Sequence, residues 1–223
     1  MNGEFEPCYD SLLIEPDNIE IIRDQIAALL ALDLDRQHEL AVQAEDPNAA
    51  DYNVRVFVEN DDPLQYTDDD SEESNPFPCV NVSIDSSAPD GGSATVNKQN
   101  MTAQFFIDCY ATGNTSSDAD FGTKASLKAW KTARLVRRIL RAEPNTYLRL
   151  RGVVGKVLFK FQSGEPSAPQ SSVRVKMVRI TLSVDYVEGV EITNGVIDWE
   201  IVGIITDGNG MIIIQEEKQE EGD

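Results

Sequence analysis

The pattern of apolar and polar residues changes along the chain between an alternating repeat and a helical one. In residues 101–110 every second side chain is apolar, which predicts a strand with one buried face. In residues 124–141 the apolar side chains instead recur at helical spacing, and they form one arc of a helical wheel: Ala125, Ala129, Ala133, Val136, Ile139 and Leu140. This arc predicts a helix that packs against a sheet.

The same two patterns predict the rest of the fold. Asp17 precedes Glu20 by one helical turn, an Asp variant of the capping box, and apolar residues follow at helical spacing. A helix is therefore expected to begin near Pro16 or Asp17. Strands are expected at residues 53–58, 78–84, 101–110, 147–151, 153–161 and 173–188.

The end of the chain adds further strand signals. Within residues 173–188 the alternation slips at Met177 and Val178, which predicts the extra residue of a β-bulge. Turn sequences in residues 190–215 predict added strands beyond it. The expected fold class is α+β, with a mixed, mainly antiparallel β-sheet packed by two helices and with added C-terminal β-strands.

The pattern also divides the chain into parts. Residues 1–14 are expected to form an N-terminal arm, and residues 15–188 an α/β domain with a single core. Within that domain, residues 59–74 form an acidic insertion. Residues 189–215 hold the added strands, and residues 216–223 form a charged tail that we expect to be disordered.

Charge is distributed unevenly over these parts. Residues 1–120 hold 4 basic and 26 acidic residues (net −22), residues 121–179 hold 14 and 2 (net +12), and residues 180–223 hold 1 and 11 (net −10). The total of −20 is unlike that of a general nucleic-acid binder. A positive block between two negative ones can, however, attract a second copy of the same chain. Such a head-to-tail contact closes into a ring when the rotation permits.

The positive block centres on the helix at residues 124–141, whose arc opposite the apolar one holds no acidic residue. Cations by themselves fit a solvated face. Large apolar residues among them fit a partner interface, because interfaces use aromatic and Arg anchors inside a polar rim. The interface residues that this second interpretation predicts are Lys124, Leu127, Lys128, Trp130, Lys131, Arg134, Leu135 and Arg138.

The acidic insertion has three interpretations. Its carboxylates suggest calcium, but the spacing of an EF-hand, with its central Gly and terminal Glu, is absent. A mobile, solvated segment fits its composition. In the third interpretation, the insertion is an acidic surface that receives the basic helix of a neighbouring copy. The residues of this partner surface would be Asp61, Asp62, Asp68, Asp69, Asp70, Glu72 and Glu73.

The sequence offers no constellation typical of catalysis. No nucleophile stands with a base, and no phosphate loop or metal-ligand cluster occurs, so we expect no enzyme, cofactor or metal site. His38 is the only histidine, and the three cysteines are expected to be reduced, packed thiols. A hydrolase that uses Asp108 or Asp185 is a remote alternative. No apolar run approaches the roughly 20 residues of a membrane span.

Element order and two segments carry a resemblance. Residues 107–113, Ile-Asp-Cys-Tyr-Ala-Thr-Gly, lead into a helix with Ala129, Trp130 and Ala133, and a late strand ends in Ile-Thr-Leu-Ser-Val-Asp-Tyr-Val-Glu at residues 180–188. Over about residues 15–188 the chain resembles the tail terminator (tail-completion, head-tail joining) proteins of long-tailed bacteriophages. Residues 59–74 and the strands after Val190 depart from the compact form of that family.

The resemblance implies a structural virion protein that forms a homohexameric ring at the head-proximal end of the tail tube. There it would end tube polymerisation and join the tail to the neck, while DNA passes through the lumen without specific binding. The implied partners are further copies of itself, the tail tube protein and the stopper protein of the neck, with the tail sheath protein as a further candidate. Assembly would take place in the host cytoplasm.

Two other functions remain open. The chain fits another neck component, such as a stopper or collar protein. It also fits a nucleic-acid-binding virion protein, in which the basic helix acts together with Arg149, Arg151, Lys156 and Lys160.

Overall fold

The computed structural model describes residues 16–60, 78–90, 98–112, 121–164, 175–189, 205–206 and 212–213. The elements in chain order are α1 (Asn18–Gln43), the 3₁₀ helix η1 (Ala49–Tyr52), β1 (Arg55–Val58), β2 (Cys79–Pro89), β3 (Gln99–Thr112), α2 (Phe121–Arg141), the 3₁₀ helix η4 (Glu143–Asn145), β4 (Val153–Gly164), β5 (Val175–Glu188), β6 (Ile205–Thr206) and β7 (Ile212–Ile213). The predicted N-terminal arm, nearly all of the acidic insertion and the predicted C-terminal tail lie outside the described residues.

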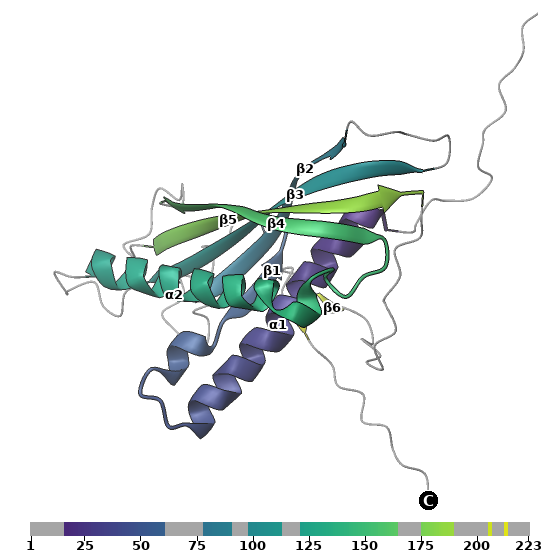
Figure 1. The fold of residues 1–223 in the computed structure, drawn as a ribbon. Coiled ribbons are helices and arrows are strands. Elements are labelled where there is room, and N and C mark those ends of the chain that lie inside the picture. Colours follow the sequence, from purple (N-terminus) through teal and green to yellow (C-terminus); the bar gives the residue numbers. More distant parts are fainter. Residues whose placement is uncertain are drawn as a thin grey trace, which may run out of the picture.

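Five strands form one sheet in the order β1-β2-β3-β5-β4. β1 runs parallel to β2, and the other neighbours in this sheet pair antiparallel. Both long helices lie on one face of the sheet, with α2 against β3 and β5 and with α1 against β1 and β2 (Figure 1). The α+β class, with a mixed, mainly antiparallel sheet packed by two helices, is thus confirmed. β6 and β7 pair antiparallel within the segment where added strands are expected.

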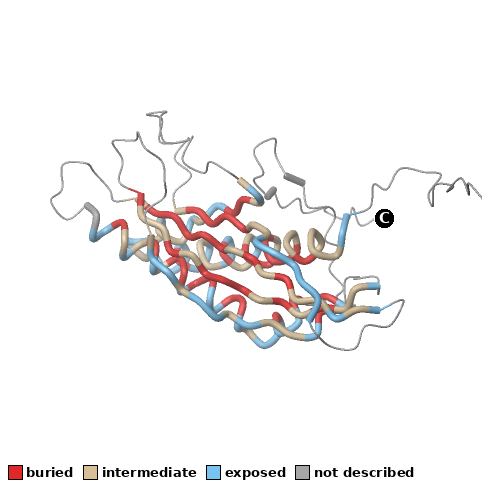
Figure 2. Tube along the Cα trace, turned by 90° about the horizontal axis from the view of Figure 1, so that it is seen from above, coloured by how far each residue is buried: buried red, intermediate tan, exposed pale blue. Residues whose placement is uncertain are grey.

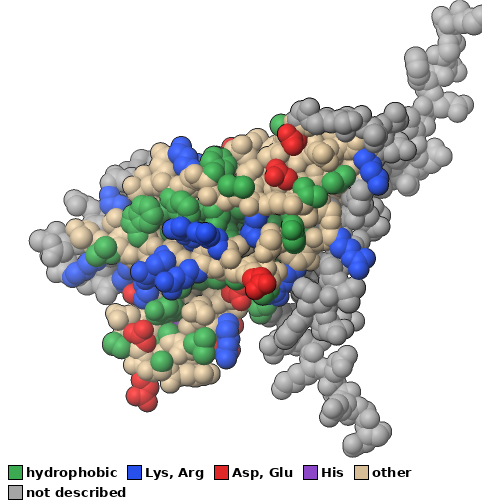
Figure 3. All heavy atoms as spheres, in the orientation of Figure 1, with side chains coloured by type: hydrophobic (Ala, Val, Ile, Leu, Met, Phe, Trp, Pro, Cys, Tyr) green, Lys and Arg blue, Asp and Glu red, His purple; other side chains and the backbone are tan. Residues whose placement is uncertain are grey.

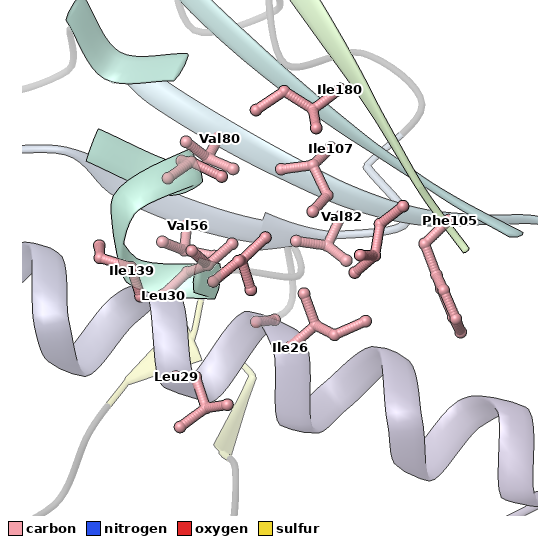
Figure 4. Close-up of a cluster of buried hydrophobic side chains, with 14 of the residues drawn as sticks. Ile26, Leu29, Leu30, Val56, Val80, Val82, Phe105, Ile107, Ile139 and Ile180 are labelled. Atoms are coloured by element: carbon pink, nitrogen blue, oxygen red, sulfur yellow. The ribbon is translucent and has the colours of Figure 1, made fainter. Parts of the chain in front are cut away.

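The core lies between the sheet and the helices. Ile26 and Leu30 of α1 point to the sheet, where they meet Val82 and Ile107, and Ile139 of α2 joins them (Figure 4). Burying one such side chain contributes about 1.5–3 kcal/mol. Buried residues follow the central strands, whereas the edge strand β4 alternates irregularly between partly buried and exposed positions (Figure 2).

The start of α1 confirms the predicted capping box. The Asp17 carboxylate accepts a hydrogen bond from the N–H of Asn18 at 2.8 Å, and the Glu20 carboxylate accepts one from the N–H of Asp17 at 2.8 Å. The two acidic side chains therefore satisfy N–H groups that have no partner inside the helix.

Asp17→Ala is expected to lower the free energy of unfolding by about 1 kcal/mol, because the first turn of α1 loses its cap. Chemical denaturation followed by circular dichroism measures this change. Asp17→Asn is the matched control, since Asn caps a helix nearly as well as Asp. An equal loss in both variants would show that the cap contributes little.

Residues 147–151 are not the strand that their alternation predicts. They form a turn between η4 and β4, in which Leu148 and Arg149 have positive φ angles of 53° and 56°. Leu148 and Leu150 are nevertheless buried in the core. A turn that enters the core twice produces the same alternation as a strand, and this explains the wrong prediction.

The bulge predicted at Met177 and Val178 is also wrong. β5 keeps one register with β3 along its whole length. Val178 belongs to the core under the helices, whereas Met177 packs on the opposite face against Tyr110 and Val175. Both faces of β5 are apolar at this end, so the alternation is lost without an extra residue. The register shifts occur instead in the pairing of β2 with β3 and of β4 with β5.

Candidate functional site: two helix surfaces of opposite charge

The register of α2 separates a buried side from an exposed one. All six residues of the predicted apolar arc are buried, and three of them are alanines, which let the helix approach the sheet closely. On the exposed side, Leu127 is 65% and Trp130 43% accessible. Figure 3 shows Lys and Arg side chains gathered over this helix, with hydrophobic side chains beside them.

We define the α2 face as the exposed stripe that α2 presents to solvent: Leu127, Trp130, Arg134, Arg137, Arg138 and Arg141. Arg134, Arg138 and Arg141 form no ion pair with the part of the chain that the structure describes. Arg137 lies over the ring of Phe161 in β4, 5.4 Å from its centroid, which joins the edge of the stripe to the sheet. Lys124, at its N-terminal end, is exposed as well.

Two of the predicted interface cations have an acidic partner within the same chain. Lys128 and Lys131 lie 3.2 and 3.3 Å from the two carboxylate oxygens of Asp51 in η1. Lys131 also stacks over the ring of Tyr52, with Nζ 3.9 Å from the centroid. These contacts tie η1 to α2. Lys128 and Lys131 are therefore not part of the α2 face.

Leu135 does not lie on the surface where the prediction places it. It is 9% exposed and belongs to the core. At about 100° per residue, Leu135 falls on the side of α2 that also carries Lys128 and Lys131. That side packs toward η1 and α1, so the buried arc of α2 is wider than contact with a sheet alone would make it.

The strand next to the α2 face is the sheet edge β4, and it exposes further apolar side chains: Val154, Val157 and Phe159. Lys160 of this strand is exposed, whereas Lys156 and the nearby Arg149 have local partners. Lys156 Nζ donates to the backbone carbonyls of Asn145 and, at 2.8 Å, of Thr146, and burial lowers the pKa of this amine. Arg149 donates to the side chain of Asn145 at 3.0 Å. Lys156 and Arg149 thus hold the turn after α2 in place.

The predicted acidic partner surface, from Asp61 to Glu73, lies outside the described residues. The structure describes a different acidic surface, on the C-terminal half of α1. What we call the α1 end consists of exposed residues of this half and of Glu45, which follows the helix: Leu32, Asp35, Glu39, Leu40, Val42 and Glu45. Here too, exposed apolar side chains lie among acidic ones. Arg36, a cation in the same half of α1, is exposed as well and pairs with Glu39 at 2.5 Å.

The α1 end was not predicted from the sequence. The apolar arc of α1 explains Ile22, Ile26 and Leu30, but Val42 falls outside that arc. An apolar residue out of phase with the buried arc is the signal that could have revealed it. In Figure 1 this half of α1 projects beyond the sheet, and this leaves most of its circumference open.

The opposite face of the sheet holds an ion pair whose carboxylate is buried. Asp108 Oδ1 and Oδ2 accept hydrogen bonds from Nε and a terminal nitrogen of Arg179, both at 2.7 Å. Arg179 stacks over Phe106 at 4.1 Å, and the hydrogen bond that Arg179 donates to Asp108 raises the pKa of Arg179. The Tyr110 hydroxyl donates to Asp108 at 3.4 Å, and burial raises the pKa of that hydroxyl. Asp108 is therefore fully occupied by its structural partners.

Asp185, the other carboxylate considered for hydrolysis, accepts a hydrogen bond from Thr102 across the β3–β5 pairing at 2.7 Å. Cys79 and Cys109 are buried free thiols, and burial raises the pKa of both. Within the described residues, no three His, Cys, Asp or Glu side chains are grouped so that they could hold a metal ion. In the same part of the chain, none of the helices has the length and apolar character needed to cross a membrane.

No known family model matches the chain, and no curated protein is similar enough in sequence to count as a match. The two helix surfaces are therefore the features of the chain that indicate a function.

Proposed function

We propose that this chain is a structural virion protein of the tail terminator kind. In this proposal it assembles into a homohexameric ring at the head-proximal end of a phage tail tube, ends tube polymerisation and joins the tail to the neck. The observation that carries the proposal is the α2 face, where Trp130 and Leu127 are exposed among arginines that have no ion pair in the described residues.

The α2 face has the composition of an interface. Trp and Arg are the residues most enriched among interface hot spots, and a rim of charge around an apolar centre is the usual arrangement. A solvated helix gains nothing from exposing Trp130 and Leu127 on the same stripe. The fold agrees with the architecture that the resemblance implies, namely two helices against a mixed sheet.

Charge segregation supports assembly with copies of the same chain. The described residues 16–60 hold 3 basic and 10 acidic side chains, whereas residues 121–164 hold 11 and 1. One copy can therefore present a negative surface to the positive surface of the next. If the contact is heterologous, repetition closes a ring.

Absolute mass from light scattering tests this function. At low salt, with purified tail tube protein present, we expect a species of about six copies, and we expect high salt to weaken it because exposed charges are screened. A monomer at every salt concentration, indifferent to tube protein, would remove the proposal. A complex with portal-side proteins but not with tube protein would favour a stopper or collar instead.

A nucleic-acid-binding virion protein is the second candidate, and the exposed cations Arg134, Arg138 and Arg141 are the observation that favours it. It predicts DNA binding with a steep salt dependence that is lost when these arginines are replaced. The engagement of Arg149 and Lys156 in the turn after α2 counts against a wider basic surface.

A further inference from the structure

We infer that the α2 face of one copy binds the α1 end of a second copy, with the two helices lying side by side. This inference rests on the proposed self-assembly and names the two surfaces that meet. The partner of the basic helix is then the α1 end, which the structure describes, and not the acidic insertion.

The two surfaces are comparable in length. From Leu127 to Arg141 the α2 face spans 14 residue steps, and the helical part of the α1 end spans 10, from Leu32 to Val42, because α1 ends at Gln43. At about 1.5 Å per residue, the stripes are roughly 21 and 15 Å long. Both stripes run along the exposed side of a helix, so the shorter one can lie along the longer one over its full length.

Apolar and charged positions follow each other along both stripes. Along α2 the apolar pair Leu127 and Trp130 comes first, and the arginines follow. Along α1 the acidic residues Asp35 and Glu39 lie between the exposed apolar residues Leu32 and Val42. Apolar residues of one copy can therefore meet apolar residues of the next while positive charges meet negative ones.

The spacing of the charges matches. Arg134 and Arg138 lie four residues apart, as do Glu39 and Asp35, and four residues correspond to about 6 Å along a helix. The two arginines of one copy can therefore meet the two acidic residues of the next at the same time. Glu39 gives up little for the new contact, because its present pair with Arg36 is solvent-exposed.

A charge-swap experiment tests the contact. Variant one carries Asp35→Lys and Glu39→Lys, and variant two carries Arg134→Glu and Arg138→Glu. Each alone places like charges opposite each other, which is expected to weaken self-association about 100-fold or more. An equal mixture restores opposite charges at every contact, so it is expected to regain the mass of the wild-type assembly. Light scattering measures the absolute mass in all three samples.

The matched control for variant one is Asp85→Lys with Asp90→Lys, which changes the net charge equally at exposed positions of the β2 end. This control is expected to assemble like the wild type. Circular dichroism melting shows that each variant is folded.

The outcomes separate the inference from the function. If variant one assembles normally while variant two does not, the α1 end is not the partner, although the ring proposal survives. If each variant is monomeric alone and their mixture is monomeric as well, the pairing is also overturned. A wild-type dimer that both variants break and their mixture restores would support the contact and contradict the ring. A wild type that never associates would remove both.

Discussion

Reversing two charges on the α2 face, by Arg134→Glu together with Arg138→Glu, will leave the chain folded and monomeric. Both arginines are exposed and form no ion pair with the described residues, so the folded monomer loses no contact there. The free energy of unfolding is expected to change by less than about 0.5 kcal/mol. At the interface the new carboxylates would face the acidic surface of the neighbour, where like charges cost several kcal/mol.

Arg55→Glu with Arg151→Glu is the matched control for this variant. These arginines are also exposed, lie outside the α2 face, and change the net charge by the same amount. Mass from light scattering and thermal melting by circular dichroism are to be measured for both double variants. Assembly that survives the change on α2, or that fails equally in the control, would reject the α2 face as an interface.

The fold was predictable wherever one element buries one face. The apolar arc of α2 and the apolar side of β3 each pack against a single surface, and both predicted elements are confirmed. The capping box of α1 was predictable because it depends only on Asp17 and Glu20, one turn apart. Such local signals do not depend on how distant parts of the chain come together.

The wrong predictions all involve residues that contact more than one element. Leu135 is buried because α1 packs beside α2, and a helical wheel contains no information about a second helix. Met177 is partly buried on the face of β5 that the helices do not cover. Leu148 and Leu150 enter the core from a turn. For Met177, Leu148 and Leu150 the pattern correctly indicated burial and wrongly indicated the structure that produces it, whereas Leu135 was wrongly placed on the exposed face.

The candidate site was predictable only in part, for the same reason. The basic stripe of α2 follows from helical periodicity, but the pairing of Lys128 and Lys131 with Asp51 requires the position of η1. The α1 end depends on where the sheet stops covering a long helix, and this is a property of the tertiary structure. Periodicity therefore locates charged stripes, whereas packing decides which of them are exposed.

Arg179→Met will lower the free energy of unfolding by about 3 kcal/mol, because it leaves the carboxylate of Asp108 buried without its partner. The side chain of Asp108 is 4% exposed, whereas that of Arg179 is 38% exposed. The two single changes are therefore unequal. Asp108→Leu leaves an arginine that can reach water, so it is expected to cost only about 1 kcal/mol.

The double variant Asp108→Leu with Arg179→Met decides whether charge burial is the cause. It removes both charges and keeps apolar volume over Phe106, so it is expected to recover most of the stability that Arg179→Met loses. Chemical denaturation gives the three free energies. If the double variant is as unstable as the sum of the single ones, the pair stabilises the sheet through packing. Recovery instead shows that the bidentate contact mainly neutralises a carboxylate on the sheet face opposite the helices, and that the β3–β5 pairing does not depend on it.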